Sequence, residues 1–382
     1  MARCLAGDPP SMLPPELLAE MCAPALFSIL VEGLADRFEP ALCDAYVRLF
    51  SHAIAQAAGD LDAAALVERF ERVRRVRSVS IEPRRVFVLS RVTLGADVAV
   101  TSVLLDAAKR RFPNARIVFV GPRKNYELFA CDARLEHADV AYQRGSLRDR
   151  VAVWNELRSL CVGADNLVID PDSRLTQLGL LPICADERYH LFESRAYGGD
   201  GYDSLSELAA AWARETLQVE GARPYLALAA PAPARAGIAV SLGVGDNPAK
   251  RLPDPFEEEL LSLLAATGLP LTIDKGAGGE EAARVVEACR RAGIQPTFWE
   301  GSFAGFAAIV ATSRLYVGYD SAGQHVAAAA GVPLISIFAG FPVDRMFARW
   351  RPVAKNALVI RVDEPDVEAT LAQVRDALGR FE

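Results

Sequence analysis

The sequence predicts an α/β protein with two Rossmann-like doubly wound domains behind a helical N-terminal extension. A chain of 382 residues exceeds what one hydrophobic core usually serves and favours two domains. Short β-branched or leucine-rich runs alternate with helical stretches in both halves, which is typical of parallel sheets. A proline- and alanine-rich stretch, residues 220–237, is interpreted as the connection between the halves.

Residues 1–80 form the predicted helical extension. Apolar residues recur there at three- and four-residue spacing, on one face of a helix: Leu42, Tyr46, Leu49, Phe50 and Ile54. Asp60-Leu61-Asp62 begins a further helix that ends in an arginine-rich run. The apolar stripe is interpreted as core, with a homodimer face or a cap over a binding site as alternatives.

The first Rossmann-like domain is predicted over residues 81–222. Its expected strands are Val86–Leu89, Ile117–Val120 and Leu167–Ile169, and its expected helices are Val98–Arg111 and Leu147–Leu160. Residues 171–203 are polar and glycine-rich, and long loops above a sheet are either functional or disordered.

The second Rossmann-like domain is predicted over residues 236–365. Its expected strands are 238–242, 270–274, 314–318 and 333–338, and its expected helices are 255–266 and 326–330. A last helix, Val367–Leu378, falls in residues 366–382.

Residues 316–333 hold the most informative motif. An apolar run is followed by Asp320 and Ser321, then by glycine, His325 and an alanine-rich helical segment. The first N–H groups of a helix lack intrahelical partners and carry about half a positive charge, so they stabilise phosphate. Ser321 is predicted to cap this helix, and Gly323 to let a ligand approach the backbone. Taken alone, a capped βα turn with a core histidine is the simpler interpretation.

A second motif changes that balance. Residues 238–253 are interpreted as a buried strand, a turn that includes Gly243, and the cations Lys250 and Arg251. Strand ends of one doubly wound domain converge on the same crevice, where ligands bind. Together the two motifs favour a ligand that bears phosphate.

An acidic pair, Glu280-Glu281, follows the glycines of residues 276–279. One of the two is a candidate to bind the ribose of a nucleotide, as an acidic residue does in dinucleotide-binding folds. A carboxylate in the first turn of a helix, favoured by the helix dipole, is the simpler interpretation.

Both motifs resemble glycosyltransferase family 9, the heptosyltransferases of the GT-B fold. Residues 250–253 lie on its G-x-x-x-x-K-x-W-P segment, and residues 320–328 on its D-T-G-x-x-H-x-A-A segment. Residues 86–121 resemble the opening strand, Gly-Asp-Val turn and helix of the family. The sequence departs from the family at four places: Ser321 replaces threonine, Ala322 replaces glycine, Leu252 replaces tryptophan, and Ala96 separates Gly95 from Asp97.

The resemblance, over roughly residues 84–365, implies two domains facing across a cleft, with the last helix packing back on the first domain. It implies an inverting, metal-independent transfer of a sugar, with heptose favoured, from a nucleotide diphosphate to an acceptor hydroxyl. Asp97 would be the catalytic base, with capping of the following helix as its alternative role. The implied donor site is Lys250, Asp320, Ser321, Ala322, Gly323, His325, Gly243, Glu280 and Glu281. The first domain would bind the acceptor, with Arg91, Arg174 and Arg195 as candidates.

Composition limits the other classes of function. The formal net charge of −7 argues against nucleic acid as a main partner. Seven cysteines without a C-x-x-C pair and four scattered histidines predict no metal site and a reducing compartment. No apolar run approaches the roughly 18–20 residues of a membrane span, and no signal peptide is evident. We therefore expect a cytoplasmic protein, with peripheral attachment to the inner membrane as an open alternative.

Two other functions stay open beside transfer. A sugar-nucleotide 2-epimerase would bind the same donor without an acceptor. A catalytically inactive sugar-nucleotide-binding or scaffolding protein is suggested by Ala322, Leu252 and the extra helical segment. An interaction module unrelated to sugars would leave the agreement of three motifs as coincidence. The family resemblance favours ADP-heptose as the donor.

Overall fold

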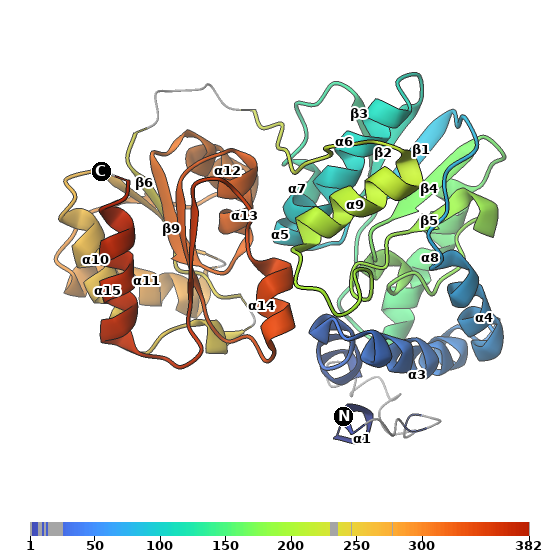
Figure 1. Ribbon diagram of the computed structural model, residues 1–382, viewed down its shortest axis with the longest axis horizontal. Helices are drawn as coiled ribbons and strands as arrows, with labels where there is room; N and C mark the ends of the chain where they lie inside the picture. The colour runs from blue at the N-terminus through green and yellow to red at the C-terminus, as the bar shows by residue number, and fades with distance from the viewer. Residues whose placement is uncertain are drawn as a thin grey trace. The chain divides into compact units, whose positions relative to one another are not determined.

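The computed structural model describes residues 2–6, 10, 13, 26–229, 236–245, 247–276 and 278–381. The chain divides into two compact units (Figure 1). The first unit contains Met1–Tyr126 and Asp132–Pro224, and the second contains Glu127–Cys131 and Tyr225–Glu382. Each unit has one parallel sheet, so the predicted α/β class is confirmed.

The sheet of the first unit has the strand order β3-β2-β1-β4-β5. Its strands are β1 (Arg85–Leu89), β2 (Arg116–Gly121), β3 (Leu135–Asp139), β4 (Asn166–Asp170) and β5 (Tyr189–Leu191). The strand order reverses between β1 and β4, so the carboxyl ends of these two strands flank a topological switch point. The sequence did not predict β3 and β5, because one is partly polar and the other is only three residues long.

Helices cover both faces of this sheet (Figure 1). Three consecutive segments form one helical stretch after β1: α5 (Leu94–Ala96), the π-helical η5 (Asp97–Thr101) and α6 (Ser102–Arg111). The others are α7 (Arg123–Tyr126), α8 (Leu147–Cys161), α9 (Leu205–Leu217) and two 3-10 turns, η6 (Arg174–Thr176) and η7 (Asp186–Arg188). Helix α6 packs against α9, whereas α8 shares its core with the opposite face of the sheet.

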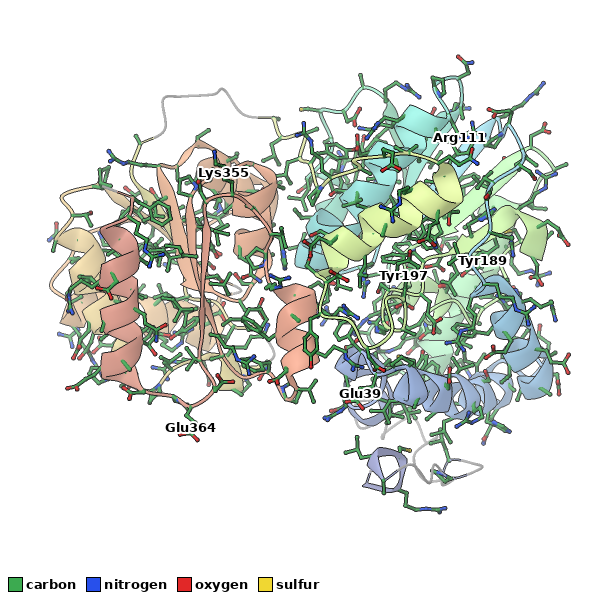
Figure 2. All side chains as sticks on the ribbon, in the orientation of Figure 1. Glu39, Arg111, Tyr189, Tyr197, Lys355 and Glu364 are labelled. Atoms are coloured by element: carbon green, nitrogen blue, oxygen red, sulfur yellow. The ribbon has the colours of Figure 1, made fainter. Side chains whose placement is uncertain are left out.

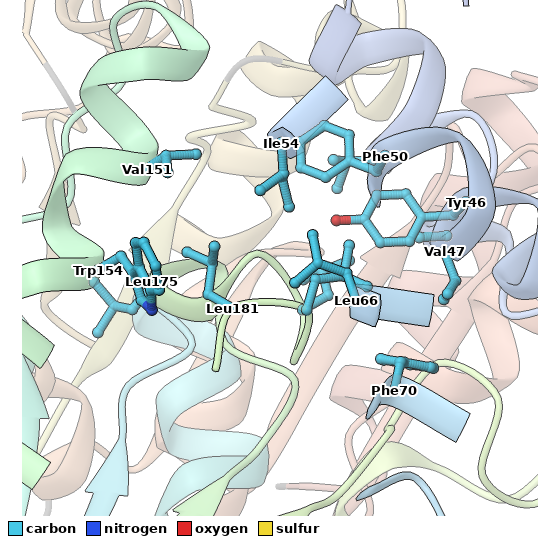
Figure 3. Close-up of a cluster of buried hydrophobic side chains, with 14 of the residues drawn as sticks. Tyr46, Val47, Phe50, Ile54, Leu66, Phe70, Val151, Trp154, Leu175 and Leu181 are labelled. Carbon is cyan, nitrogen blue, oxygen red and sulfur yellow. The ribbon is translucent and has the colours of Figure 1, made fainter. Parts of the chain in front are cut away.

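The predicted N-terminal extension is helical and is part of the first unit. Its described elements are α1 (Ala2–Leu5), η3 (Ser28–Glu32), η4 (Ala35–Arg37), α3 (Pro40–Ala58) and α4 (Ala63–Val73). Figure 3 shows Tyr46, Phe50 and Ile54 of α3 in one cluster with Val151 and Trp154 of α8. The interpretation of the stripe as core is therefore confirmed, because all five side chains are buried within the first unit.

The sheet of the second unit has the strand order β11-β10-β9-β6-β7-β8. Its strands are β6 (Ile238–Ser241), β7 (Leu271–Asp274), β8 (Thr297–Trp299), β9 (Leu315–Tyr319), β10 (Leu334–Phe338) and β11 (Ala357–Arg361). In chain order this is the 3-2-1-4-5-6 arrangement of dinucleotide-binding folds. The switch point lies between β6 and β9, the two strands that precede the predicted motifs.

The helices of the second unit also cover both faces of its sheet (Figure 1). They are η8 (Pro248–Lys250), α10 (Phe256–Ala265), α11 (Gly279–Arg291), α12 (Phe303–Thr312), α13 (Ala322–Ala329), α14 (Asp344–Trp350) and α15 (Val367–Leu378). Helix α15 was expected to pack back on the first domain. Its buried residues Leu371, Val374 and Leu378 belong instead to the core of the second unit, where α15 contacts α10.

Candidate functional site

The predicted cation and the predicted aspartate meet at the switch point of the second unit. Lys250 Nζ donates to Asp320 Oδ2 at 2.6 Å and to the backbone oxygen of Asp320 at 3.2 Å. The turn η8 presents Lys250, and Asp320 directly follows β9. Because the lysine side chain is 21% exposed and the carboxylate 9%, the pair is partly open to solvent.

Helix α13 begins beside this pair, and Ser321 occupies its N-cap position. The prediction that Ser321 caps the helix is wrong, because its side chain makes no capping hydrogen bond. Its hydroxyl lies 3.2 Å from the hydroxyl of Tyr316 instead. No side chain at the N-cap therefore satisfies the first N–H groups of α13, and such groups favour an anion.

Gly323 has a different role from the predicted one. A Cβ at this position would lie 2.4 Å from Tyr316 Oη and 2.6 Å from its Cζ. The absent side chain therefore makes room for Tyr316, which is fully buried, and not for a ligand. The glycine allows α13 to pack closely on β9, while the neighbouring Ala322 is half-buried.

Gln324 is a member of this group that the sequence analysis missed. Its side chain is fully buried; Nε2 donates to Asp320 Oδ1, and Oε1 accepts a hydrogen bond from Ser336 at 2.5 Å. Asp320 is thus held between Lys250 and Gln324. No local pattern indicates this contact, because Asp320 precedes the N-cap of α13 whereas Gln324 lies in the first turn of the helix.

His325 is buried next to the same pair, and its ring centroid lies 5.9 Å from that of Trp350. Burial lowers the pKa of His325 to about 4; the charge of Asp320 opposes this effect and that of Lys250 adds to it. The imidazole is therefore neutral at neutral pH, and acts as a hydrogen-bonding group without charge.

The structure distinguishes the two predicted ribose-binding candidates. Glu281 lies over the turn after β6, where its Oε2 accepts a hydrogen bond from Val244 N at 3.1 Å. A Cβ on Gly243 would lie 3.0 Å from Glu281 Oε1, so this glycine leaves space for the carboxylate. Glu280 is exposed and makes no such contact within the described residues. Glu281 alone lies at the carboxyl ends of the strands.

Asp97 occupies the corresponding edge of the first unit. Its Oδ2 accepts hydrogen bonds from Ser90 Oγ and Asn125 Nδ2, both at 2.6 Å. Its Oδ1 accepts from Arg91 N at 2.7 Å and Thr101 Oγ1 at 2.6 Å. Asp97 does not cap a helix, because the helical stretch begins three residues earlier at Leu94.

The environment of Asp97 counts against a role as base in this conformation. The residue has no solvent exposure, and both oxygens already have two donors. Burial raises the pKa of Asp97 above its ordinary value, although these hydrogen bonds lower it. The preceding turn contains Val92 at φ +71°, an unfavourable angle for a β-branched residue and a sign of strain. An acceptor hydroxyl reaches the carboxylate only if one of the four donors leaves.

The three predicted acceptor-site arginines lie around two aspartates. Arg195 binds Asp36 Oδ1 through Nε at 2.7 Å and Asp172 Oδ2 through Nη1 at 2.8 Å. Arg174 Nη2 lies 3.6 Å from Asp36 Oδ2. Arg91 donates to Ser194, whose hydroxyl lies 3.1 Å from Asp172 Oδ2. The structure therefore brings all three arginines into one polar cluster.

Asp36 was not predicted, since it comes from the N-terminal extension. Burial alone would raise the pKa of Asp36, but the charges of Arg195 and Arg174 outweigh it, and the pKa lies below its ordinary value. The carboxylate is therefore ionised. Only the fold reveals this contact, because Asp36 and Arg195 are 159 residues apart.

Asp170, at the end of β4, is a structural carboxylate. It accepts hydrogen bonds from Thr176 and from the buried Tyr189, which is labelled in Figure 2, both at 2.5 Å. Burial raises its pKa to about 6.

Within the described residues, no three histidine, cysteine, aspartate or glutamate side chains are grouped to hold a metal ion. In the same part of the chain, no helix has the length and apolar character needed to cross a membrane.

Comparisons with known proteins agree with this architecture. Residues 192–374, just under half of the chain, match the model of Glycosyltransferase family 9 (heptosyltransferase). That range contains the whole group around Lys250 and excludes Asp97, Arg91 and Arg174. Lipopolysaccharide heptosyltransferase 3 of Escherichia coli is 28% identical over 102 residues, which cover 26% of this chain and 29% of that protein. The chain thus aligns with less than a third of this curated relative.

Solved structures are similar over most of the chain. A family 9 glycosyl transferase from Veillonella parvula has a TM-score of 0.58 at 15% identity, covering 79% of this chain and 92% of that one. The E. coli heptosyltransferase WaaC with ADP has a TM-score of 0.57 at 18% identity, covering 77% and 99%. The E. coli ADP-heptose heptosyltransferase II has a TM-score of 0.54 at 19% identity, covering 78% and 98%. At these identities the likeness shows the fold.

Proposed function

We propose that this chain, which is similar to glycosyltransferase family 9 and has the GT-B fold, is an inverting glycosyltransferase. It would move a sugar, with heptose favoured, from a nucleotide diphosphate to an acceptor hydroxyl without a metal ion. The observation that carries this proposal is the Lys250–Asp320 pair beside the uncapped start of α13, within the residues that match the family.

The chemistry of transfer suits this group. As the glycosidic bond breaks, negative charge grows on the leaving diphosphate. The Lys250 ammonium and the first N–H groups of α13 would stabilise that charge. Removing one preorganised donor of this kind commonly costs about 3–4 kcal/mol of transition-state stabilisation. Asp320 and Gln324 would hold the lysine in place, and neutral His325 would add a hydrogen bond without competing charge.

The nucleotide would extend along the carboxyl ends of β6 and β7. Glu281, which accepts from Val244 N, is the proposed ribose partner, and Glu280 is not. ADP-heptose is the favoured donor, because two of the similar solved proteins are named heptosyltransferases with ADP or ADP-heptose. The acceptor would lie by the Arg91, Arg174 and Arg195 cluster. We also propose that the protein is cytoplasmic and lies at the surface of the inner membrane.

A second candidate function is sugar-nucleotide binding without transfer. The observation that favours it is the complete burial of Asp97 under four hydrogen bonds. Asp97→Asn, with folding intact, tests the base directly. If Asp97→Asn kept full transfer, Asp97 would not be the base.

A thermal-shift panel tests the donor site. Wild type and Lys250→Ala are heated with ADP, UDP, GDP and CDP and their available sugar conjugates. A ligand at 100 times its dissociation constant adds about 2.7 kcal/mol of stability, enough for a shift of a few degrees. We expect one nucleotide to stabilise wild type and not Lys250→Ala. No shift with any nucleotide would contradict a sugar-nucleotide function of either kind.

A further inference from the structure

Lys250 lies on the loop between β6 and α10, so the position of this loop decides where its ammonium points. Besides the Lys250–Asp320 ion pair, two contacts of the described residues hold the loop near Lys250. Leu252 N donates to the hydroxyl of Tyr319 at 3.3 Å, and Asn247 Nδ2 donates to Gly340 O at 3.4 Å. Both are modest hydrogen bonds to neutral groups, which are typically worth about 1 kcal/mol each.

A stronger anchor comes from Glu257, a carboxylate of α10 that is 2% exposed. Its Oε1 accepts a hydrogen bond from Arg251 Nε at 3.2 Å and another from Arg284 Nη1. Arg284, on α11, also donates through Nη2 to Leu242 O at 2.9 Å. Through Arg284, one buried oxygen thus connects the residue next to Lys250 with Leu242, the first residue after β6, and so ties the two parts of the loop to α10 and α11.

This arrangement is an unusual way to stabilise a core. A buried ion network often contributes no more to stability than apolar residues of the same volume would, because desolvation offsets the attraction. Glu257 Oε2 is buried without a hydrogen-bond partner among the described residues, which adds to that cost. Its effect is on geometry instead, because hydrogen bonds between charged groups fix the relative orientation of the side chains that they join.

We propose that Glu257 is a positioning residue, which orients Lys250 toward the diphosphate of the nucleotide through Arg251 and Arg284. This inference rests on the proposed function. It assigns Glu257 no contact with the ligand, so its effect should appear only where Lys250 acts. A merely structural role would weaken the binding of every nucleotide alike.

Isothermal titration of the full chain separates these cases. The probes are ADP and AMP, with the matching uridine, guanosine and cytidine pairs. We expect Glu257→Gln to weaken the bound diphosphate about 10-fold and its monophosphate less than about 2-fold; tenfold corresponds to about 1.4 kcal/mol. Glu259→Gln is the matched control, because Glu259 makes the same change of charge on the exposed side of the same helix.

A second variant guards against loss of folding. Arg251→Gln leaves the contact of Glu257 with Arg284 intact and should reproduce the diphosphate-specific loss. In a Lys250→Ala background, Glu257→Gln should have no further effect, because the residue acts through Lys250. Equal losses for diphosphate and monophosphate, or no loss, would overturn the inference. So would a much larger loss in Arg251→Gln, since Arg251 would then bind the ligand itself. Wild type that binds none of the eight nucleotides would overturn the proposed function and this inference together.

Discussion

Both units carry polar groups at the switch point of their sheet, and the groups differ in solvent exposure and in how many of their hydrogen bonds are already made. In the second unit, the switch point between β6 and β9 holds Lys250, which is partly exposed, and a helix start without a side-chain cap. In the first unit, the switch point between β1 and β4 holds Asp97, which is completely buried and has four donors. The switch point of the second unit therefore has uncapped helix N–H groups and a cation that favour an anion. At the switch point of the first unit, internal hydrogen bonds already occupy the carboxylate.

This difference teaches that a motif and its fold do not by themselves give a reactive group. Asp97 follows β1 and Asp320 follows β9, and each of these strands borders the switch point of its sheet, where ligands bind in such folds. Asp320 is paired with the charged Lys250, whose ammonium can also donate to a phosphate. The donors of Asp97 belong to neutral groups that fix the turn after β1 to α7. We infer that Asp97 holds a turn in place, whereas Asp320 helps to hold a ligand.

The largest expected effect comes from removing the two carboxylates in turn. Asp97→Ala leaves four buried donors without an acceptor, at about 1–3 kcal/mol for each one that stays unsatisfied. After partial relaxation, we expect the first unit to lose about 3–5 kcal/mol of its free energy of unfolding. Asp320→Ala should cost the second unit less, about 1–3 kcal/mol, because Gln324 is its one buried donor in the described residues, whereas Lys250 is partly exposed and stays hydrated.

Urea denaturation measures this pair of variants, with hydrogen exchange of peptides from each unit to assign the loss. Asp106→Ala controls for a lost carboxylate elsewhere in the same helical stretch, since the ion pair of Asp106 in the described part of the chain is with the exposed Arg110. Equal destabilisation by Asp97→Ala and Asp320→Ala would remove the distinction between the two edges.

Much of the fold followed from the sequence, because periodicity reports burial. The three strands predicted in the first half and the four in the second are present, with boundaries shifted by one residue at most. Strands β8 and β11 were missed. Residues 297–299 are too few to show a period, and residues 357–361 are mostly half-buried without alternation. Short edge strands depend on their neighbours more than on their own composition.

More of the proposed donor site than of the proposed acceptor site could be predicted from the sequence, for a physical reason. Lys250 and Asp320 each follow a recognisable strand, so the topology alone brings them together. Asp36 approaches Arg195 only through the packing of the N-terminal extension, which no local pattern encodes. The hydrogen bonds that saturate Asp97 likewise depend on Asn125, a residue of another βα turn. Sequence patterns indicate which groups converge, and packing decides which of them remain available.

A smaller effect tests the close packing of α13 on β9. Gly323→Ala places a methyl group where Tyr316 lies, 2.4 Å from its Oη. Overpacking of a buried site costs typically 1–3 kcal/mol, so we expect a loss of about 2 kcal/mol from the second unit. The displaced start of α13 should also weaken nucleotide binding.

Ala322→Gly is the matched control, because it changes the neighbouring residue in the opposite direction and introduces the glycine of the motif that this segment resembles. We expect at most about 1 kcal/mol of destabilisation from its lower helix propensity. If Gly323→Ala proved as stable as wild type, with unchanged nucleotide binding, the packing role assigned to Gly323 would be wrong.

The smallest expected effect compares two buried histidines, one in each unit. Burial lowers the pKa of both His325 and His190 to about 4. The unfolded chain takes up each proton near pH 6.5, before the folded chain does. The stability due to the neutral rings is therefore complete above about pH 6.5 and is lost as the pH falls toward 4. On this ground alone the two histidines are equivalent.

A bound diphosphate should separate them. Its negative charge beside Lys250 and Asp320 favours the protonated ring of His325, and a charge at this range moves a pKa by about 1 pH unit or more. We expect nuclear magnetic resonance titration of labelled histidines to show that ADP raises the pKa of His325 and leaves the pKa of His190 unchanged. His190 lies on β5 of the other unit, where burial and the charge of Arg77 both lower its pKa. A pKa that rose for both rings would mean a global change on binding, whereas a rise for His325 alone would locate the diphosphate at the open edge of the second unit.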